Sequence, residues 1–333
     1  MKLEQMPRYP LLCGFTPLQH MENLEQALGC GPLYIKRDDL TPLGLGGNKT
    51  RKLEFLLGDA LAGGADTLVT VGGVQTNHGR LTAAAAAKAG LACTLVLDGA
   101  RPEKLSGNLL LDCLLGASLV YTDGRSTSAV IEETLAALRA AGRAPYFIPE
   151  GGSNAVGSAG YLAMVPELLA QADSLPVPPA RLVCTMGSLG TFAGLWLGAR
   201  AFGAPFSVTG VAVNPTTGYT REKAAALVNE MSAAYGLDIA AAPEDMDIIY
   251  ADAAHDYAGS GYNVPDAKTR GAVELLARTE GIFLDPCYTA KSFRGFCDIA
   301  RELDGGAIFV HTGGTPALWT QEHLDAFAAD YWN

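Results

Sequence analysis

The chain has 333 residues, 49% of them hydrophobic, and a formal net charge of −11 with a pI near 4.9. This length predicts about two domains with a full core, and the acidic charge argues against nucleic acid or an anionic membrane as the main partner. The seven cysteines are an odd, widely spaced set without a CxxC pair, which favours reduced thiols and a cytoplasmic protein over disulfides or a zinc site. The sequence shows neither a signal-peptide core nor an apolar run of membrane-spanning length, so we expect a soluble protein without export.

Residues 1–45 predict an extended entry segment with short strands, one of them at residues 33–36. The charged residues that follow this strand, Arg37, Asp38 and Asp39, are typical of a solvated turn.

A lysine opens the first long predicted helix, directly after the flexible pair Gly46 and Gly47. Asn48 is expected to cap this helix, and apolar residues at helical spacing give it a buried face. These residues are Leu53, Leu56, Leu57, Ala60 and Leu61. Lys49 therefore lies in the first turn, where the helix dipole disfavours an ammonium group and favours a neutral, nucleophilic amine. Taken alone, the stretch is also consistent with a solvated surface lysine.

Strands and helices then alternate in the order typical of parallel βαβ units. The first block contains strand 66–71, a helix that ends at Gly90, strand 93–97, helix 108–115, strand 118–121, helix 128–141 and strand 146–148. The second contains helices 160–171, 191–202, 220–235 and 266–279 and strands 181–185, 207–213, 248–251, 282–284 and 307–311. This pattern predicts two open α/β domains with mostly parallel sheets and an active site in the cleft between them.

A glycine-rich turn follows the strand at 181–185 and opens the next helix. It consists of Gly187, Ser188, Leu189, Gly190 and Thr191. Its backbone N–H groups, two hydroxyls and the helix N-terminus suit a phosphate. The turn lacks the ending of a nucleotide P-loop and the spacing of GxGxxG, so ATP or NAD fits poorly, and an ordinary strand-to-helix turn is the alternative.

Two further stretches at strand ends carry polar side chains. Thr76, Asn77 and His78 lie between a strand and a helix and suit a carboxylate or a phenolic oxygen, although Thr76 or Asn77 could simply cap that helix. The second stretch, residues 285–291, contains Tyr288, which could equally be a core aromatic.

A lysine at a helix start, a phosphate cradle and a carboxylate-suited helix start would together hold pyridoxal 5′-phosphate. At these residues the chain resembles the D-cysteine desulfhydrase and 1-aminocyclopropane-1-carboxylate deaminase family of tryptophan-synthase-β-like enzymes. The resemblance runs nearly end to end, and residues 46–54 are its most specific part. It implies a larger cofactor-binding domain, residues 1–50 and 162–333, and a smaller domain, residues 51–161.

The resemblance also implies roles for the residues named above. Lys49 would form the imine with the cofactor, Asn77 would lie beside the cofactor's phenolic oxygen, and residues 187–191 would bind its phosphate. Thr312, in the loop 311–316, is a further cofactor contact. Thr76 stands where the familiar members have serine, near the substrate, and its extra methyl group bears on substrate size or stereochemistry. Tyr262 and Tyr288 match a pair of tyrosines that line the active site.

Thr289 distinguishes the branches of this family. In the cyclopropane-opening deaminases that the chain resembles, this position looks like a glutamate. A glutamate can share a proton with the ring nitrogen of the cofactor. A threonine would leave the ring largely neutral, which suffices when a good leaving group departs from the β-carbon. We therefore predict a lyase that converts D-cysteine to pyruvate, ammonia and hydrogen sulfide. Thr76, Asn77 and His78 would hold the substrate carboxylate, Lys49 or a tyrosine would remove the α-proton, and Tyr288 or Tyr262 would protonate the leaving group.

Several alternatives remain open at this point. L-cysteate sulfo-lyase would use the same elimination with sulfite as the leaving group, and the cyclopropane deaminase is disfavoured by Thr289. A non-catalytic protein that binds an amino acid or pyridoxal phosphate is the alternative from a different class. Relatives suggest a homodimer with a small amino-acid substrate, no metal, and neither nucleic acid nor membrane as a partner.

Overall fold

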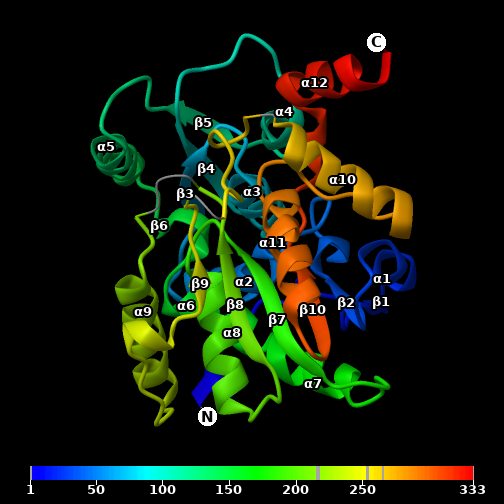
Figure 1. The fold of residues 1–333 in the computed structure, drawn as a ribbon. Coiled ribbons are helices and arrows are strands. Elements are labelled where there is room, and N and C mark those ends of the chain that lie inside the picture. Colours follow the sequence, from blue (N-terminus) through cyan, green and yellow to red (C-terminus); the bar gives the residue numbers. More distant parts are fainter. Residues whose placement is uncertain (1, 215–217, 253–254, 265, 333) are drawn as a thin grey trace.

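The computed structural model describes residues 2–214, 218–252, 255–264 and 266–332, which form two twisted sheets (Figure 1). The six-stranded sheet has the order β1-β2-β10-β7-β8-β9, with β1 antiparallel to β2 and the other pairs parallel. The four-stranded sheet is parallel, in the order β5-β4-β3-β6. The strands are β1 (Leu18–His20), β2 (Leu33–Arg37), β3 (Thr67–Gly73), β4 (Ala92–Asp98), β5 (Ser118–Tyr121), β6 (Pro145–Ile148), β7 (Pro179–Met186), β8 (Ser207–Ala212), β9 (Ile248–Ile249) and β10 (Gly306–His311).

Helices connect these strands and flank both sheets (Figure 1). The α-helices are α1 (Glu22–Leu28), α2 (Lys49–Ala62), α3 (Asn77–Ala89), α4 (Gly107–Leu114), α5 (Thr127–Ala140), α6 (Ala155–Leu162), α7 (Met164–Ala172), α8 (Gly190–Ala201), α9 (Arg221–Tyr235), α10 (Ala267–Glu280), α11 (Thr289–Glu302) and α12 (Gln321–Trp332). Short 3-10 turns are η1 (Lys2–Gln5), η2 (Asp38–Leu40), η3 (Glu150–Gly152), η4 (Pro243–Asp245) and η5 (Thr315–Trp319).

The six-stranded sheet is buried on both faces. Successive side chains of a strand point to opposite faces, so β2 contributes to two cores. Tyr34 packs into the core formed with α6, α7, α8 and α9, whereas Leu33 and Ile35 pack into the core formed with α1, α10 and α11. Burial on both faces explains the continuous apolar runs at residues 33–35 in β2, 182–184 in β7 and 307–310 in β10.

A third core lies between the four-stranded sheet and the helices α2 and α3. Leu68 and Leu95 from the sheet meet Leu53, Leu56 and Leu57 from α2, all fully or nearly fully buried. The apolar face that the sequence predicts for α2 therefore packs on the small sheet, except for Leu61, which is exposed in the last turn of the helix. The first turn of the helix projects toward the large sheet.

The mixed, mostly parallel α/β architecture confirms the predicted fold class. Two predicted elements are wrong. The helix expected at 160–171 is two helices, because Pro166 lacks an N–H group and is tolerated only in the first turn of a helix, here that of α7. The strand expected at 282–284 is not formed: this described segment pairs with neither sheet, and the apolar side chains of Ile282 and Leu284 are buried in the core shared with α10 and α11.

The sequence reading also missed three helices: α1, α11 and α12. The larger sheet takes its strands from residues 18–37 and 179–311, and the smaller sheet from residues 67–148. The domain limits at residues 50 and 162 stay a prediction. In the part of the chain that the structure describes, every helix is too short or too polar to span a membrane.

Candidate active site

A cavity of about 490 Å³ opens at the carboxyl ends of β3, β7 and β10, where α/β folds bind ligands. Polar groups from both sheets converge on it. Its walls are Asn48, Lys49, Gly73, Thr76, Asn77, His78, Asp98, Glu150, Gly151, Thr185, Gly187, Ser188, Thr191, Asn214, Gly261, Tyr262, Tyr288, Thr312 and Gly313. The structure therefore brings together most of the residues that the sequence singles out.

Lys49 is the first residue of α2 and lies on the cavity wall. Gly46, before it, has a φ of +74°, and a Cβ there would lie 1.8 Å from the carbonyl oxygen of Asp39, so the tight approach to the helix requires glycine. Burial lowers the pKa of Lys49 to about 8, and the acidic groups of Glu150 and Asp285 oppose this shift. Loss of water on burial is thus the largest cause of the lowered pKa of this amine.

Asn48 does not cap α2 as expected. Its backbone is already helical, and its side chain makes no capping hydrogen bond. Instead Asn48 Nδ2 donates to Thr191 Oγ1 at 3.0 Å. Thr41 holds the turn before the helix, because its hydroxyl accepts from Gly47 N at 2.8 Å. The side chain of Asn48 therefore joins the start of α2 to the start of α8, and its Oδ1 accepts from Lys49 Nζ at 3.0 Å.

The glycine-rich turn lies at the N-terminus of α8. Gly187, Ser188 and Thr191 line the cavity, whereas Leu189 and Gly190 are buried behind them. Ser153 supports the turn: its hydroxyl donates to Ser188 Oγ at 2.9 Å and accepts from Gly190 N at 3.0 Å. The first N–H groups of a helix have no helical partner, so this turn offers donors to an anion.

Lys52 is a neighbour of this turn that the sequence alone did not bring to notice. Its fully buried ammonium group donates to Gly151 O at 2.9 Å, and a Cβ on Gly190 would lie 2.7 Å from its Nζ. Burial, assisted by Lys49, lowers the pKa of Lys52 well below its usual range. A doubly negative phosphate in the turn would favour its charged form. Lys49 and Lys52 are three residues apart in α2, and this spacing places them on the same face of the helix.

Thr76, Asn77 and His78 line the cavity at the start of α3. Thr76 caps the helix by accepting from Gly79 N at 3.2 Å, and its own hydroxyl hydrogen stays available to a ligand. Burial, with the nearby charges of Lys49 and Lys52, lowers the pKa of His78 well below its usual range, so its imidazole is neutral. Thr76 is therefore the cap of this helix, and the binding roles of Thr76, Asn77 and His78 stay predictions.

Tyr262 and Tyr288 meet edge to face on the cavity wall, with ring centroids 5.8 Å apart. Burial raises the pKa of both phenols well above the usual range. Both phenols therefore carry their proton near neutrality and hold it more tightly than a free tyrosine does. Lys291, from α11, holds the loop that carries Tyr262, because its Nζ donates to Ala258 O at 2.7 Å and to Gly261 O at 2.8 Å.

Thr312 lines the cavity from the loop after β10, whereas Thr289 is fully buried at the start of α11 and is not part of the wall. Thr289 Oγ1 donates to Asp285 Oδ1 at 2.6 Å and accepts from Asp285 N at 2.8 Å. The hydroxyl of Thr289 therefore already donates one hydrogen bond and accepts another within the loop. The role of Thr289 beside a ring nitrogen stays a prediction.

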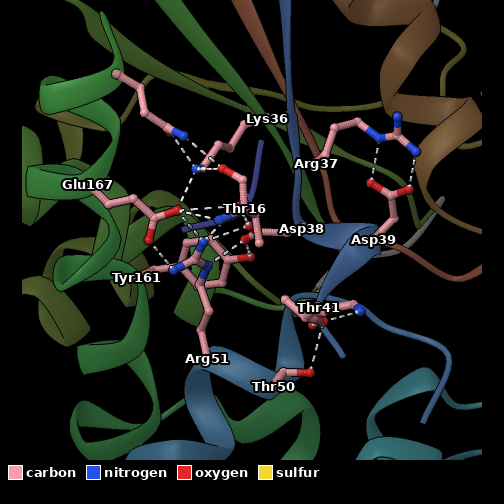
Figure 2. Close-up of polar contacts among 12 residues, drawn as sticks. Thr16, Lys36, Arg37, Asp38, Asp39, Thr41, Thr50, Arg51, Tyr161 and Glu167 are labelled. Carbon is pink, nitrogen blue, oxygen red and sulfur yellow. Dashed lines mark hydrogen bonds and ion pairs between the residues drawn. The ribbon is translucent and has the colours of Figure 1, made fainter. Parts of the chain in front are cut away.

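A buried network of charged side chains holds the first turn of α2 through Arg51 (Figure 2). Arg51 donates to Asp38 and to Glu167 through four hydrogen bonds of 2.9 Å, and Lys36 donates to Glu167 as well. Asp38 is fully buried, so the solvated turn expected at residues 37–39 is wrong for this residue. Its carboxylate is paired, which is the condition for burying a charge. The network anchors α2 two residues beyond Lys49.

These features fit pyridoxal phosphate. The amine of Lys49 suits an aldehyde, and the turn at α8 suits a phosphate. A Cβ on Gly187 would lie 3.0 Å from the ring of Tyr288, so glycine keeps the entrance of that turn open. Lys49, Gly187, Ser188, Thr191 and Asn77 are the residues that would hold the cofactor.

Comparisons with known proteins agree with this fit. The family described as pyridoxal-phosphate dependent enzyme matches residues 10–313. A D-cysteine desulfhydrase of Yersinia enterocolitica is 40% identical over 96% of this chain and 97% of its own length. A putative 1-aminocyclopropane-1-carboxylate deaminase of Pyrococcus abyssi is 39% identical over 95% of this chain and 94% of its own.

Solved structures show the same relationship. The crystal structure of an ACC deaminase homologue superposes with a TM-score of 0.88 at 36% identity, covering 98% of this chain and 97% of that one. A fungal L-serine ammonia-lyase from Rhizomucor miehei shares the fold, with a TM-score of 0.66 at 19% identity, over 96% of this chain and 98% of its own. The predicted cofactor and the predicted family are confirmed. The chain belongs to the pyridoxal-phosphate dependent enzymes, among relatives named D-cysteine desulfhydrase and putative 1-aminocyclopropane-1-carboxylate deaminase.

Proposed function

We propose that this enzyme is a lyase that eliminates the β-substituent of a small amino acid, with D-cysteine as the preferred substrate and pyruvate, ammonia and hydrogen sulfide as products. The observation that carries the proposal is the pairing, on one cavity wall, of a lysine amine with a pKa of about 8 and two protonated tyrosines. An elimination needs a base for the α-proton and an acid for the leaving group. The names of the relatives support the same reaction.

Bound pyridoxal phosphate supplies the electron-accepting ring system on which amino-acid chemistry of this kind depends. The protein residues supply binding and proton transfer. The free N–H groups and the Thr76 hydroxyl at the start of α3 bind the substrate carboxylate. Lys49 Nζ accepts the α-proton, and Tyr288 or Tyr262 donates a proton to the departing sulfur. Ammonia and pyruvate then form by hydrolysis of the released enamine.

Charge on the cavity wall favours cysteine over cysteate. Among the described wall residues Lys49 is the one lysine or arginine, while Asp98 and Glu150 are acidic and exposed at the open side. His78 is neutral. A sulfonate would bring a further negative charge past this rim without a cation to receive it, whereas the thiol of cysteine is uncharged below its pKa.

The deaminase reaction on the cyclopropane substrate is the second candidate. It is favoured by the names of two relatives, at 39% and 38% identity, and of the solved homologue. Thr289 weighs against the deaminase reaction in our proposal. Its hydroxyl is hydrogen-bonded to Asp285 and does not act as an acid near neutrality. Loss of a good leaving group needs less electron withdrawal by the ring than cleavage of a carbon–carbon bond.

A substrate panel tests the proposal. The purified enzyme with pyridoxal phosphate is assayed for keto acid with D-cysteine, L-cysteine, β-chloroalanine, L-cysteate, serine and the cyclopropane amino acid. We expect pyruvate and sulfide from D-cysteine at the highest kcat/KM. A preference for the cyclopropane amino acid would overturn the choice of branch. Cofactor binding without any keto acid would point to the non-catalytic alternative.

We also propose that the enzyme works in the cytoplasm as a homodimer. All seven cysteines are free, which suits a reducing compartment. Large apolar side chains on the surface, among them Leu45 and Phe283, each 59% exposed, suit contact with a second copy. Light scattering of the purified protein measures its mass, and a monomer at micromolar concentration would refute the dimer.

A further inference from the structure

The side chain of Asn77 is held by a second asparagine, Asn108, from the neighbouring helix α4. Asn108 Nδ2 donates to Asn77 Oδ1 and to the carbonyl oxygen of Gln75, each at 2.9 Å. Asn108 Oδ1 accepts from Arg80 Nε at 2.7 Å. Asn108 and Arg80 are fully buried, and neither is on the cavity wall.

We propose that Asn108 is a positioning residue that turns the amide of Asn77 so that its N–H donor faces the cofactor, and that Arg80 in turn fixes Asn108. The inference rests on the proposed role of Asn77 beside the phenolic oxygen of pyridoxal phosphate. It assigns a function to two buried residues that touch neither cofactor nor substrate.

The direction of each amide follows from donor and acceptor chemistry. A guanidinium group can only donate, so the atom of Asn108 that faces Arg80 must be its oxygen. The NH₂ group of Asn108 then faces Asn77, and the atom of Asn77 that receives it must be an oxygen. Asn77 Nδ2 is left on the other side. A reversed amide at either position would oppose two donors or two acceptors within hydrogen-bond distance.

Asn77 Nδ2 is free to act as a donor. Within the described residues it has no hydrogen-bond partner, and a Cβ on Gly314 would lie 2.9 Å from it, which places it beside the loop of Thr312 and Gly313 on the cavity wall. An N–H group there stabilises a phenolate oxygen, whereas an amide oxygen would repel it.

Arg80 connects the hydrogen-bonded side chains of Asn108 and Asn77 to the loop that precedes Lys49. Its guanidinium group donates to the carbonyl oxygens of Gly44 and Gly46, the latter at 3.2 Å. The same side chain thus holds the loop that leads to the covalent lysine and the amide that faces the phenolic oxygen. The spacing between these two cofactor contacts is set by one buried arginine.

The variant Asn108→Asp tests the proposal. A carboxylate keeps an acceptor for Arg80 but cannot donate to Asn77, so Asn77 turns its NH₂ group toward the new acceptor and its oxygen toward the cofactor. We expect the affinity of the apoenzyme for pyridoxal phosphate to fall roughly tenfold, since one charge-assisted hydrogen bond is lost. The pH midpoint of the visible band of the bound cofactor should rise, because a phenolate without its donor holds the neighbouring proton more tightly.

A double-mutant cycle separates positioning from general stability. In an Asn77→Ala background there is no amide to orient, so Asn108→Asp should have little further effect on affinity or on the midpoint. Asn229→Asp, the same chemical change at an exposed position of α9 far from the cavity wall, is the matched control and should behave as wild type in cofactor affinity and midpoint. Asn108→Ser, which keeps a hydroxyl but cannot reach Asn77, serves as the second variant if Asn108→Asp melts below the assay temperature.

Two results would overturn the proposal: an unchanged affinity and midpoint in Asn108→Asp, or a loss of the same size in the Asn77→Ala background. In either case a wild-type enzyme that binds the cofactor and releases pyruvate would leave the proposed function intact. A wild-type protein that does not develop the visible band with pyridoxal phosphate would refute the proposed function and this inference together.

Discussion

Asn48 and Thr191 lie 143 residues apart in sequence, and their side chains meet in a hydrogen bond of 3.0 Å between Asn48 Nδ2 and Thr191 Oγ1. One residue precedes the lysine at the start of α2 and the other ends the glycine-rich turn at α8. The bond therefore sets the distance between the proposed covalent and phosphate contacts of one ligand.

Removal of this bond should loosen the cofactor. We expect Asn48→Ala to lower the affinity for pyridoxal phosphate about tenfold, because the two contacts are no longer held at one spacing. Fluorescence titration of the apoenzyme measures the change. An unchanged dissociation constant, with the melting temperature also unchanged, would show that the bond has no positioning role.

The lowered pKa of Lys49 has a kinetic consequence. Only the neutral amine attacks an aldehyde, and burial lowers the pKa of Lys49 from the ordinary 10.5 to about 8. The rate at which the apoenzyme attaches pyridoxal phosphate should therefore rise with pH and level off above about pH 8. Stopped-flow absorbance measures this rate. A rate that still rises steeply toward pH 10 would indicate an unshifted lysine.

The acidic rim should set the choice between neutral and anionic substrates. We expect Glu150→Gln combined with Asp98→Asn to raise kcat/KM for L-cysteate several-fold relative to D-cysteine, because two negative charges at the open side are removed. Salt should weaken the effect. Glu133→Gln, an exposed acid on α5, is the control, and an equal change in both variants would rule out the rim.

The charge network of α2 should carry stability. Arg51 and Lys36 hold the pKa of Glu167 below its usual range although burial acts to raise it. Glu167→Gln leaves the buried ammonium group of Lys36 without its acidic partner, while Arg51 keeps its pair with Asp38. We expect a loss of about 3 kcal/mol in the free energy of unfolding. The wild-type contribution is present above the unfolded pKa of a glutamate and disappears as the pH falls through the lower folded value. Urea unfolding of Glu167→Gln and Glu133→Gln compares the buried pair with an exposed one.

Much of the fold was predictable because local patterns decide it. The buried face of α2 and the βαβ alternation follow from spacing alone, and both agree with the structure apart from Leu61, which is exposed. The start of α11 was not predicted. Its cap is Asp285, which accepts from the N–H groups of three residues that follow a proline: Cys287, Tyr288 and Thr289. The repeat of Ala290, Phe293, Cys297 and Ala300 at helical spacing was the signal available in the sequence.

The residues on the cavity wall could be predicted from the sequence. The buried residues that support them through side-chain contacts could not. Lys49, Thr76 and Asn77 stand at element starts, where sequence reasoning looks for chemistry. Lys52 lies inside α2, and Asn108 stands at the start of the predicted helix 108–115, where it could be taken for an ordinary capping residue. Both reach the site only through tertiary contacts. Asp38 shows the same limit, since its arginine partner is thirteen residues away.

The most direct test of the central claim is the release of sulfide and pyruvate from D-cysteine by the wild-type enzyme, by Lys49→Ala and by Lys88→Ala, an exposed lysine on α3. We predict equal amounts of the two products from wild type and Lys88→Ala, and a loss of at least a thousandfold in kcat for Lys49→Ala, since both the covalent contact and the base are removed. Turnover of D-cysteine by Lys49→Ala at the wild-type rate would contradict the account.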